Sequence, residues 1–118
     1  MATTFDELAR EVLRFRDERE WGRFHTPKNL AMGLGIEAGE LAELFLWKDD
    51  AEIAEALRDP AYREKVAHEL ADVQVYLLVL AHASGIALDD AVRAKMTLNA
   101  QKYPVEKARG NAKKYDEL

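Results

Sequence analysis

The sequence contains no cysteine among its 118 residues and only three prolines. The absence of cysteine excludes disulfides and thiolate metal sites. Long apolar runs are also missing, because the longest, residues 73–83, is interrupted by Gln74 and His82 and is too short to span a bilayer. No signal-peptide pattern precedes the first helical pattern. We therefore expect a cytoplasmic protein with no membrane partner.

Basic residues are outnumbered, with 17 Lys and Arg against 22 Asp and Glu, which gives a net charge of −5. This balance argues against a nucleic acid polymer as partner, because polymer binding neutralises many phosphates. Residues 95–114 nevertheless concentrate basic side chains, namely Lys95, Lys102, Lys107, Arg109, Lys113 and Lys114. A local cationic strip on an acidic protein favours a small anionic ligand.

Strand-like alternation and internal repeats are absent too, whereas helical periodicity covers most of the chain. Thr4 and Glu7 form a capping box that predicts a helix over about residues 5–19. Thr26-Pro27 places a cap residue before a proline and predicts the start of a second helix. A short helical connection is expected from Asp49-Asp50.

A third helix is predicted from Asp59-Pro60 to a C-terminal Gly85, and Asp89 is expected to cap a fourth that stops before Pro104. The third helix is apolar nearly all round, which is typical of a helix buried on two sides. Its main predicted core stripe consists of Val66, Leu70, Val73, Leu77 and Leu80. A second stripe consists of Val75, Leu78 and Val79.

These patterns predict an all-α fold, a four-helix bundle that assembles as an oligomer. The second apolar side of the third helix is most simply covered by another subunit. We expect a helical domain over residues 1–103 and a polar tail over residues 104–118. We expect this tail to be mobile, or ordered only by substrate or by a neighbouring subunit.

Two acid pairs, Glu37/Glu40 and Glu69/Asp72, lie inside the two most apolar helices. Residues three apart on a helix are rotated by about 60°, so each pair projects from one face. Two such helices packed together would gather four acids in one place. Buried carboxylates repel one another unless a cation compensates, and oxygen ligands favour Mg²⁺, with Mn²⁺ as an alternative.

Two other interpretations of the acids are open at this point. Acids with this spacing are common on an ordinary solvated helix face, although a second matched pair makes that interpretation weaker. Di-iron carboxylate bundles also use helix-borne acids, but they require Glu-x-x-His pairs, which this sequence lacks. A magnesium site that leaves positions open for phosphates points to phosphoryl or nucleotidyl chemistry.

The run from Glu37 to Trp47, followed by Glu69-Leu-Ala-Asp72, resembles the E-x-x-E and E-x-x-D signature of the MazG-like, all-α nucleoside triphosphate pyrophosphohydrolases. Residues 19–30 and 99–104 resemble the dCTP pyrophosphatase branch of that superfamily. The resemblance covers nearly the whole chain, from about Phe5 to Leu118.

The resemblance implies hydrolysis of a nucleoside triphosphate to a monophosphate and pyrophosphate, with dCTP or a modified pyrimidine deoxynucleotide as the substrate. Glu37, Glu40, Glu69 and Asp72 would be the metal ligands, and Glu37 or Glu40 would accept the proton of the attacking water. Relatives form tetramers built from dimers, so a homo-oligomer is expected, either a dimer or a homotetramer.

The resemblance also implies a set of substrate contacts. Trp21 and Trp47 would help enclose the base, with His25 and Asn29 as further base or sugar contacts. Contacts to the phosphates or sugar are expected from Tyr76, Lys95, Asn99, Lys102, Tyr103 and Arg109. On periodicity alone, a solvated surface stripe is an equally good interpretation of Lys95, Asn99 and Lys102.

One position departs from the branch, because Val12 stands where mammalian dCTP pyrophosphatases carry a histidine near the base. Strict cytosine specificity is therefore a weaker expectation than a pyrimidine triphosphate in general. The competing function is a non-catalytic helical oligomer whose acids bind a metal or a partner.

Overall fold

The computed structural model describes residues 4–118, which form helices and connecting turns without any strand. The prediction of an all-α fold is therefore confirmed. The chain divides into two compact units, the first ending at Gly85 and the second beginning at Ile86.

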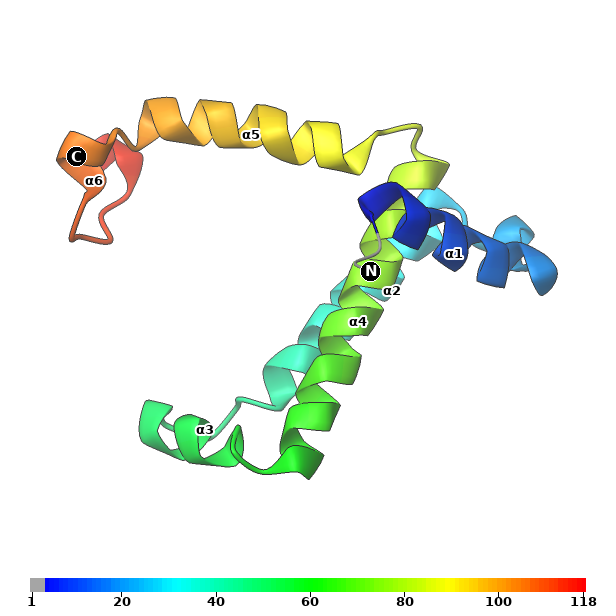
Figure 1. Cartoon of the computed structure of the whole chain (residues 1–118), viewed down its shortest axis with the longest axis horizontal. Helices are drawn as coiled ribbons and strands as arrows, with labels where there is room; N and C mark the ends of the chain where they lie inside the picture. The colour runs from blue at the N-terminus through cyan, green and yellow to red at the C-terminus, as the bar shows by residue number, and fades with distance from the viewer. Residues whose placement is uncertain (1–3) are drawn as a thin grey trace. The chain divides into compact units, whose positions relative to one another are not determined.

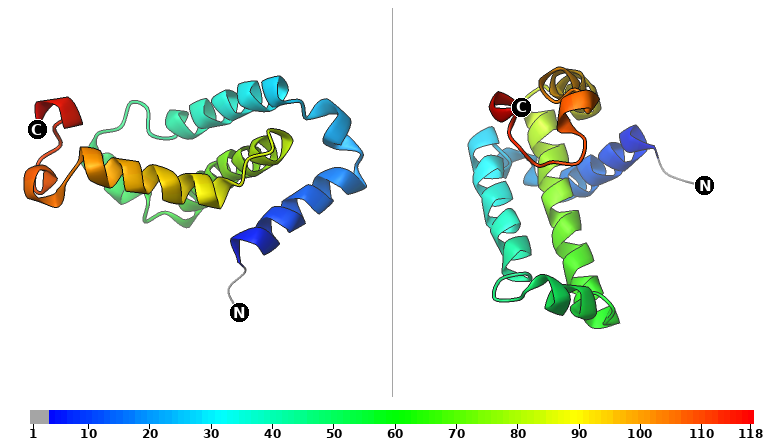
Figure 2. Two further views of the ribbon diagram at one scale, coloured as in Figure 1. Left: turned by 90° about the horizontal axis from the view of Figure 1, so that it is seen from above. Right: turned by 90° about the vertical axis from the view of Figure 1, so that its left-hand side faces the viewer.

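The first unit is built around two long helices that lie side by side. Its elements are α1 (Phe5–Glu18), the 3₁₀ helix η1 (Trp21–Phe24), α2 (Pro27–Glu43), α3 (Asp50–Ala56) and α4 (Pro60–Ala83). Figure 1 shows α2 and α4 packed along each other and joined at one end by α3, and the second view in Figure 2 agrees. Helix α1 packs against α4. The buried apolar side chains are Leu30, Val66, Leu78 and Val79.

The predicted helix starts of this unit are confirmed by their caps. Thr4 and Glu7 form the capping box, and the Thr26 hydroxyl accepts a hydrogen bond from a backbone N–H of the first turn of α2. The Asp59 carboxylate accepts a hydrogen bond from the backbone N–H of Ala61 in the first turn of α4. At the other end of α4, Gly85 adopts φ +69°, a left-handed conformation that glycine accepts without steric cost.

Helix α4 is apolar on more than one side, but one chain does not cover all of them. Leu70, predicted as a core position, is 54% exposed, so that prediction is wrong within a single chain. The reason is rotational: the face of α4 toward α2 carries Glu69 and Val73, and Leu70 lies about 100° away from Glu69.

The second unit contains α5 (Leu88–Lys102), α6 (Val105–Ala108) and the 3₁₀ helix η2 (Tyr115–Glu117). Helix α5 ends before Pro104, as predicted. Among residues 4–118 no single helix is both long and apolar enough to cross a membrane, and only α4 and α5 taken together reach the required length and composition. The tail residues 104–118 contain α6 and η2, and their separation as a distinct segment stays a prediction.

Asp89 does not cap α5, contrary to prediction. The helix begins earlier, with Ala87 at the cap position and no side-chain cap hydrogen bond. The Asp89 carboxylate instead accepts from the N–H of Asp90 and lies 3.6 Å from the Arg93 guanidinium. An acid anywhere in the first turn is stabilised by the helix dipole, so its presence does not define the first residue.

Candidate functional site

Three of the four predicted acids meet where α2 faces α4. One carboxylate oxygen from each of Glu37, Glu40 and Glu69 lies within 4.8 Å of the other two. Asp72, one turn further along α4, is close enough for its charge to act on Glu37. We call Glu37, Glu40, Glu69 and Asp72 the acid cluster. It joins carboxylates that are separated in sequence but share one helix interface.

Packing and a hydrogen bond hold the two helices that carry the acid cluster in position. Along α2 the stripe that includes Leu34, Glu37 and Leu41 is partly buried, so Glu37 occupies a position that the periodicity assigns to an apolar residue. The Tyr62 hydroxyl, near the start of α4, donates a hydrogen bond to the carbonyl of Leu44 at the end of α2. This bond ties the two acid-bearing helices together beyond the cluster.

The electrostatics of the acid cluster disfavour full ionisation. Burial raises the pKa of Glu37 to about 7, and the negative charges of Glu40, Asp72 and Glu69 add to the effect. One oxygen of Glu37 and one of Glu69 are buried without a hydrogen-bond partner among the described residues. Unpartnered anionic oxygens that crowd together fit a hard divalent cation, which supplies both charge and ligand bonds.

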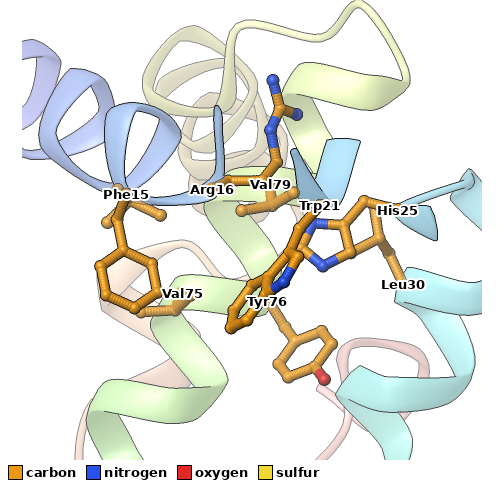
Figure 3. A pocket seen from close by; sticks show the side chains of 9 residues that line it. Phe15, Arg16, Trp21, His25, Leu30, Val75, Tyr76 and Val79 are labelled. Atoms are coloured by element: carbon orange, nitrogen blue, oxygen red, sulfur yellow. The ribbon is translucent and has the colours of Figure 1, made fainter. Parts of the chain in front are cut away.

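A second feature, which we call the aromatic pocket, lies where α1 and η1 meet α4. Its volume is about 140 Å³, and it is lined by Val12, Phe15, Arg16, Trp21, His25, Leu30, Val75, Tyr76 and Val79. Figure 3 shows the rings of Trp21 and His25 next to each other. Their centroids are 6.4 Å apart, and Trp21 packs edge-on against Phe15 at 5.8 Å. A mostly apolar pocket lined by aromatic rings suits a planar heterocycle.

Few polar groups are available in the aromatic pocket. The Nδ1 atom of His25 is buried without a hydrogen-bond partner among residues 4–118. Burial lowers the pKa of His25, and the positive charge of Arg16 lowers it further, so both effects favour the neutral imidazole. The Tyr76 ring lies against α2 at Gly33, where a Cβ atom would collide with it.

The acid cluster and the aromatic pocket lie on successive turns of α4. A second cavity of about 390 Å³ is lined by Leu8, Glu11, Val12, Phe15, Asp72 and Val75. It shares Val12, Phe15 and Val75 with the aromatic pocket, and it reaches Asp72 of the acid cluster. Tyr76 follows Asp72 by one turn, a rise of about 6 Å along the axis. The two features are thus close enough for one nucleotide to contact both.

Two predicted base contacts lie outside the aromatic pocket. The Asn29 side-chain amide donates to the carbonyl of Phe24 at 3.2 Å, which closes the turn between η1 and α2. Trp47 is 90% exposed and adopts φ +67° just after α2. Trp21 precedes α2, whose 17 residues span about 25 Å, so the two tryptophans of one chain lie at opposite ends of that helix.

The remaining predicted substrate contacts belong to the second unit. On α5, Asn99 is partly buried, and the Lys102 ammonium lies 4.8 Å from the centre of the Tyr115 ring. Tyr103 packs edge-on against the same ring at 6.2 Å. Lys95 and Arg109 are exposed. These contacts hold η2 against the end of α5 and leave the basic side chains at the surface.

Phe15, Arg16 and Val75 line the aromatic pocket, although the sequence patterns did not predict them as site residues. Phe15 and Arg16 follow Val12 by three and four positions on α1, so all three share one helix face. That spacing was a usable signal. The spacing could not show that this face of α1 packs beside η1 instead of facing solvent.

Comparison with known proteins agrees with this architecture. The MazG-like family profile matches residues 33–118. The chain is 44% identical to dCTP pyrophosphatase 1 of Rattus norvegicus and 42% identical to that of Homo sapiens, each over 98% of this chain and 68% of the relative. A crystal structure of a pyrophosphatase from Archaeoglobus fulgidus superposes with a TM-score of 0.79 at 40% identity, covering 88% of this chain and 95% of that one. The chain therefore belongs to the MazG-like family.

Proposed function

We propose that this protein hydrolyses a deoxypyrimidine nucleoside triphosphate, with dCTP as the first candidate and modified pyrimidines as alternatives. Cleavage between the α and β phosphates gives the monophosphate and pyrophosphate. The observation that carries the proposal is the acid cluster, whose three closest carboxylates lie within 4.8 Å of one another, one turn from a pocket that suits a base. Relatives that are 42–44% identical are dCTP pyrophosphatases.

The chemistry follows from the two features. Glu37, Glu40, Glu69 and Asp72 would hold a divalent cation, Mg²⁺ or in its place Mn²⁺, which when bound supplies positive charge against the phosphates. Either Glu37 or Glu40 accepts a proton from the attacking water. Glu40 is the exposed member of the three closest acids, so water reaches it without rearrangement.

The base and the triphosphate are assigned to different parts of the chain. Trp21 and His25 contact the base in the aromatic pocket, and Tyr76 contacts the sugar or the α-phosphate from the adjoining turn of α4. Contacts from Lys95, Asn99, Lys102, Tyr103 and Arg109 to the phosphates stay a prediction from the sequence resemblance. Because such substrates belong to the intracellular nucleotide pool, we propose a cytoplasmic location.

The test is a panel of standard and modified nucleoside triphosphates with Mg²⁺, scoring both pyrophosphate and monophosphate. Pyrophosphate and dCMP in equal amounts from dCTP are expected. Release of inorganic phosphate with dCDP would place the cleavage at the wrong bond. Tight binding of a basic protein partner without any turnover would favour the non-catalytic alternative.

We further propose that the working form is a homo-oligomer, either a dimer or a tetramer built from two dimers. Large apolar side chains stay exposed on α2 and α4 of a single chain, including Met32 at 64% and Ile36 at 62%. Exposed apolar area of this kind is typical of a subunit interface. If both tryptophans contact one base, Trp47 must come from a second copy, because one chain holds them at opposite ends of α2.

Complementation tests this arrangement. Trp21→Ala and Trp47→Ala variants, mixed under conditions that allow subunit exchange, should form some sites with both tryptophans. The mixture is then expected to be more active than either variant alone. A mixture no better than the average of its components would contradict the shared site, and light scattering would show whether an oligomer exists at all.

A further inference from the structure

We infer that Tyr62 is a positioning residue, which fixes the direction of Trp47 by anchoring the turn that carries it. This turn consists of residues 44–48, and we call it the Trp47 turn. The inference rests on the proposed function in its last step, where Trp47 of one copy contacts the base bound by a second copy. The anchoring itself is tested by a measurement that needs no substrate.

Trp47 adopts a backbone conformation that its own sequence does not favour. Its φ of +67° lies in the left-handed region, where the crowding of Cβ disfavours most residues other than glycine. The backbone hydrogen bond across the turn, from the N–H of Lys48 to the carbonyl of Phe45, is 3.4 Å long and therefore weak. The Trp47 side chain adds little, because it is 90% exposed. We therefore expect contacts from outside the turn to stabilise it.

Tyr62, in the first turn of α4, makes such contacts. Its hydroxyl donates a hydrogen bond to the carbonyl of Leu44, the residue at which α2 ends. Its ring packs edge-on against the Phe45 ring, with centroids 6.3 Å apart. The Lys48 ammonium lies 5.7 Å from the centre of the Tyr62 ring. One side chain of α4 thus contacts the Trp47 turn on both sides of Trp47.

The same hydrogen bond joins α2 to α4, but we expect its effect on the acid cluster to be small. Leu44 follows Glu37 by seven residues, and Tyr62 precedes Glu69 by seven, a separation of about 10 Å along each helix. Helices α2 and α4 pack along each other, as Figure 1 shows. Because side-chain packing holds these helices together, one hydrogen bond at their end contributes little to the placement of the carboxylates.

The consequence for substrate binding follows from the population of the turn. If the Trp47 turn leaves its left-handed conformation, the Trp47 ring changes direction with it. The ring is then available to a base only during the fraction of time in which the turn is formed, and the apparent affinity falls by that fraction. Tyr62 would thereby raise the affinity for substrate without contacting it, and kcat, which depends on the acid cluster, should not change.

The first measurement is the local motion of the Trp47 ring without substrate. The chain has two tryptophans, so Trp21→Phe leaves Trp47 as the single fluorophore of this type. In this background Tyr62→Phe removes the hydroxyl and keeps the ring, whereas Tyr62→Leu removes both. Thr97→Val is the matched control, because the Thr97 hydroxyl also donates to a backbone carbonyl, that of Arg93. Circular dichroism checks that each variant is folded.

Time-resolved fluorescence anisotropy measures this motion on the nanosecond timescale. We expect a larger amplitude of Trp47 motion in Tyr62→Phe than in the Trp21→Phe background, and a still larger one in Tyr62→Leu. Thr97→Val should leave the amplitude unchanged. Equal amplitudes in all of these proteins would overturn the inference, because Tyr62 would then not hold the turn.

The second measurement is steady-state kinetics with dCTP in proteins that retain Trp21. Tyr62→Phe should raise KM about fivefold, the typical effect of one lost hydrogen bond, and change kcat by less than about twofold. Because Tyr62 acts through Trp47, the same substitution in a Trp47→Ala protein should leave KM nearly unchanged.

Three kinetic outcomes would contradict the role of Tyr62. A KM effect of the same size in the Trp47→Ala protein would show that Tyr62 acts by another route. A fall in kcat, or a smaller rise in Tm with Mg²⁺, would assign Tyr62 a general structural role. An unchanged KM in Tyr62→Phe would show that the direction of Trp47 does not matter for substrate binding.

The two measurements separate this inference from the proposed function. Increased Trp47 motion in Tyr62→Phe would support the anchoring of the turn even if no triphosphate were hydrolysed. Unchanged motion in a protein that does release pyrophosphate from dCTP would overturn the role of Tyr62 and leave the hydrolase in place.

Discussion

The acid cluster and the aromatic pocket lie one turn apart on α4, yet they respond to burial in opposite directions. Loss of hydration raises the pKa of Glu37 and lowers the pKa of His25. In both places burial favours the uncharged form, which is protonated for an acid and deprotonated for an imidazole. A bound cation would therefore stabilise the acid cluster, whereas an uncharged ring would be the favoured ligand of the aromatic pocket. Together they match the two ends of a nucleotide.

The largest expected effect comes from removing one charge from the acid cluster. Glu40→Gln keeps the side-chain size and should lower kcat/KM for pyrophosphate release by roughly a hundredfold to a thousandfold. Glu43→Gln, an exposed position on the same helix, should stay within a few-fold of the unmodified protein. Near-normal activity of Glu40→Gln, with helicity intact, would remove Glu40 from the site.

Next in size is the effect of a divalent cation on stability. Mg²⁺ at about a hundred times its dissociation constant should stabilise the folded protein by about 2.7 kcal/mol, a rise of several degrees in Tm. The double variant Glu37→Gln/Glu69→Gln should show almost no rise. Thermal unfolding at matched ionic strength, with NaCl as the control, measures this difference. An equal rise in the double variant would show that the cation acts elsewhere.

The aromatic pocket should respond differently from the acid cluster. Trp21→Ala removes stacking area next to His25 and is expected to raise KM for dCTP about tenfold, with a small change in kcat. The Tm rise with Mg²⁺ should be unchanged. Steady-state kinetics and thermal unfolding on one sample test both statements. Loss of the Mg²⁺ effect in this variant would mean that the two features are not separable.

The smallest expected effect is a pH dependence of the metal-free protein. The pKa of Glu37 is about 7 in the folded state against 4.5 as its ordinary value, so the folded state binds more protons between these limits. This contribution to stability is present below pH 4.5 and is lost as the pH rises toward 7. Glu37→Gln should remove that part of the decline. Chemical unfolding at pH 5 and pH 8 measures it, and identical pH profiles would contradict it.

The acid cluster could be predicted from sequence because it depends on helical geometry alone. Glu37 and Glu40 share a face by rotation, as do Glu69 and Asp72, and their apolar neighbours direct those faces toward each other. The helix starts could also be predicted from the sequence, because Thr26-Pro27 and Asp59-Pro60 are local start signals. Of the predicted helix starts, only the one at Asp89 was wrong, because an acid that is favourable in the first turn is not necessarily the cap residue.

The aromatic pocket could not be predicted in the same way. Glu20 adopts φ +55°, a left-handed conformation that is uncommon for a residue with a Cβ atom. This turn lets the chain reverse after α1 so that Trp21 packs on Phe15. A glycine at this position would have signalled the turn, but the sequence has none there. Tertiary packing, rather than local preference, therefore creates the pocket.

Asp72 and Tyr76 lie on one continuous helix, α4, so this helix fixes the distance between the acid cluster and the aromatic pocket. A single residue inserted between them would rotate everything beyond it by about 100° and turn the pocket wall away from the acids. Inserting a whole turn would restore the direction and lengthen the gap by about 5.4 Å. If a nucleotide binds as proposed, the helix thereby sets the length of substrate that can contact both the acid cluster and the aromatic pocket.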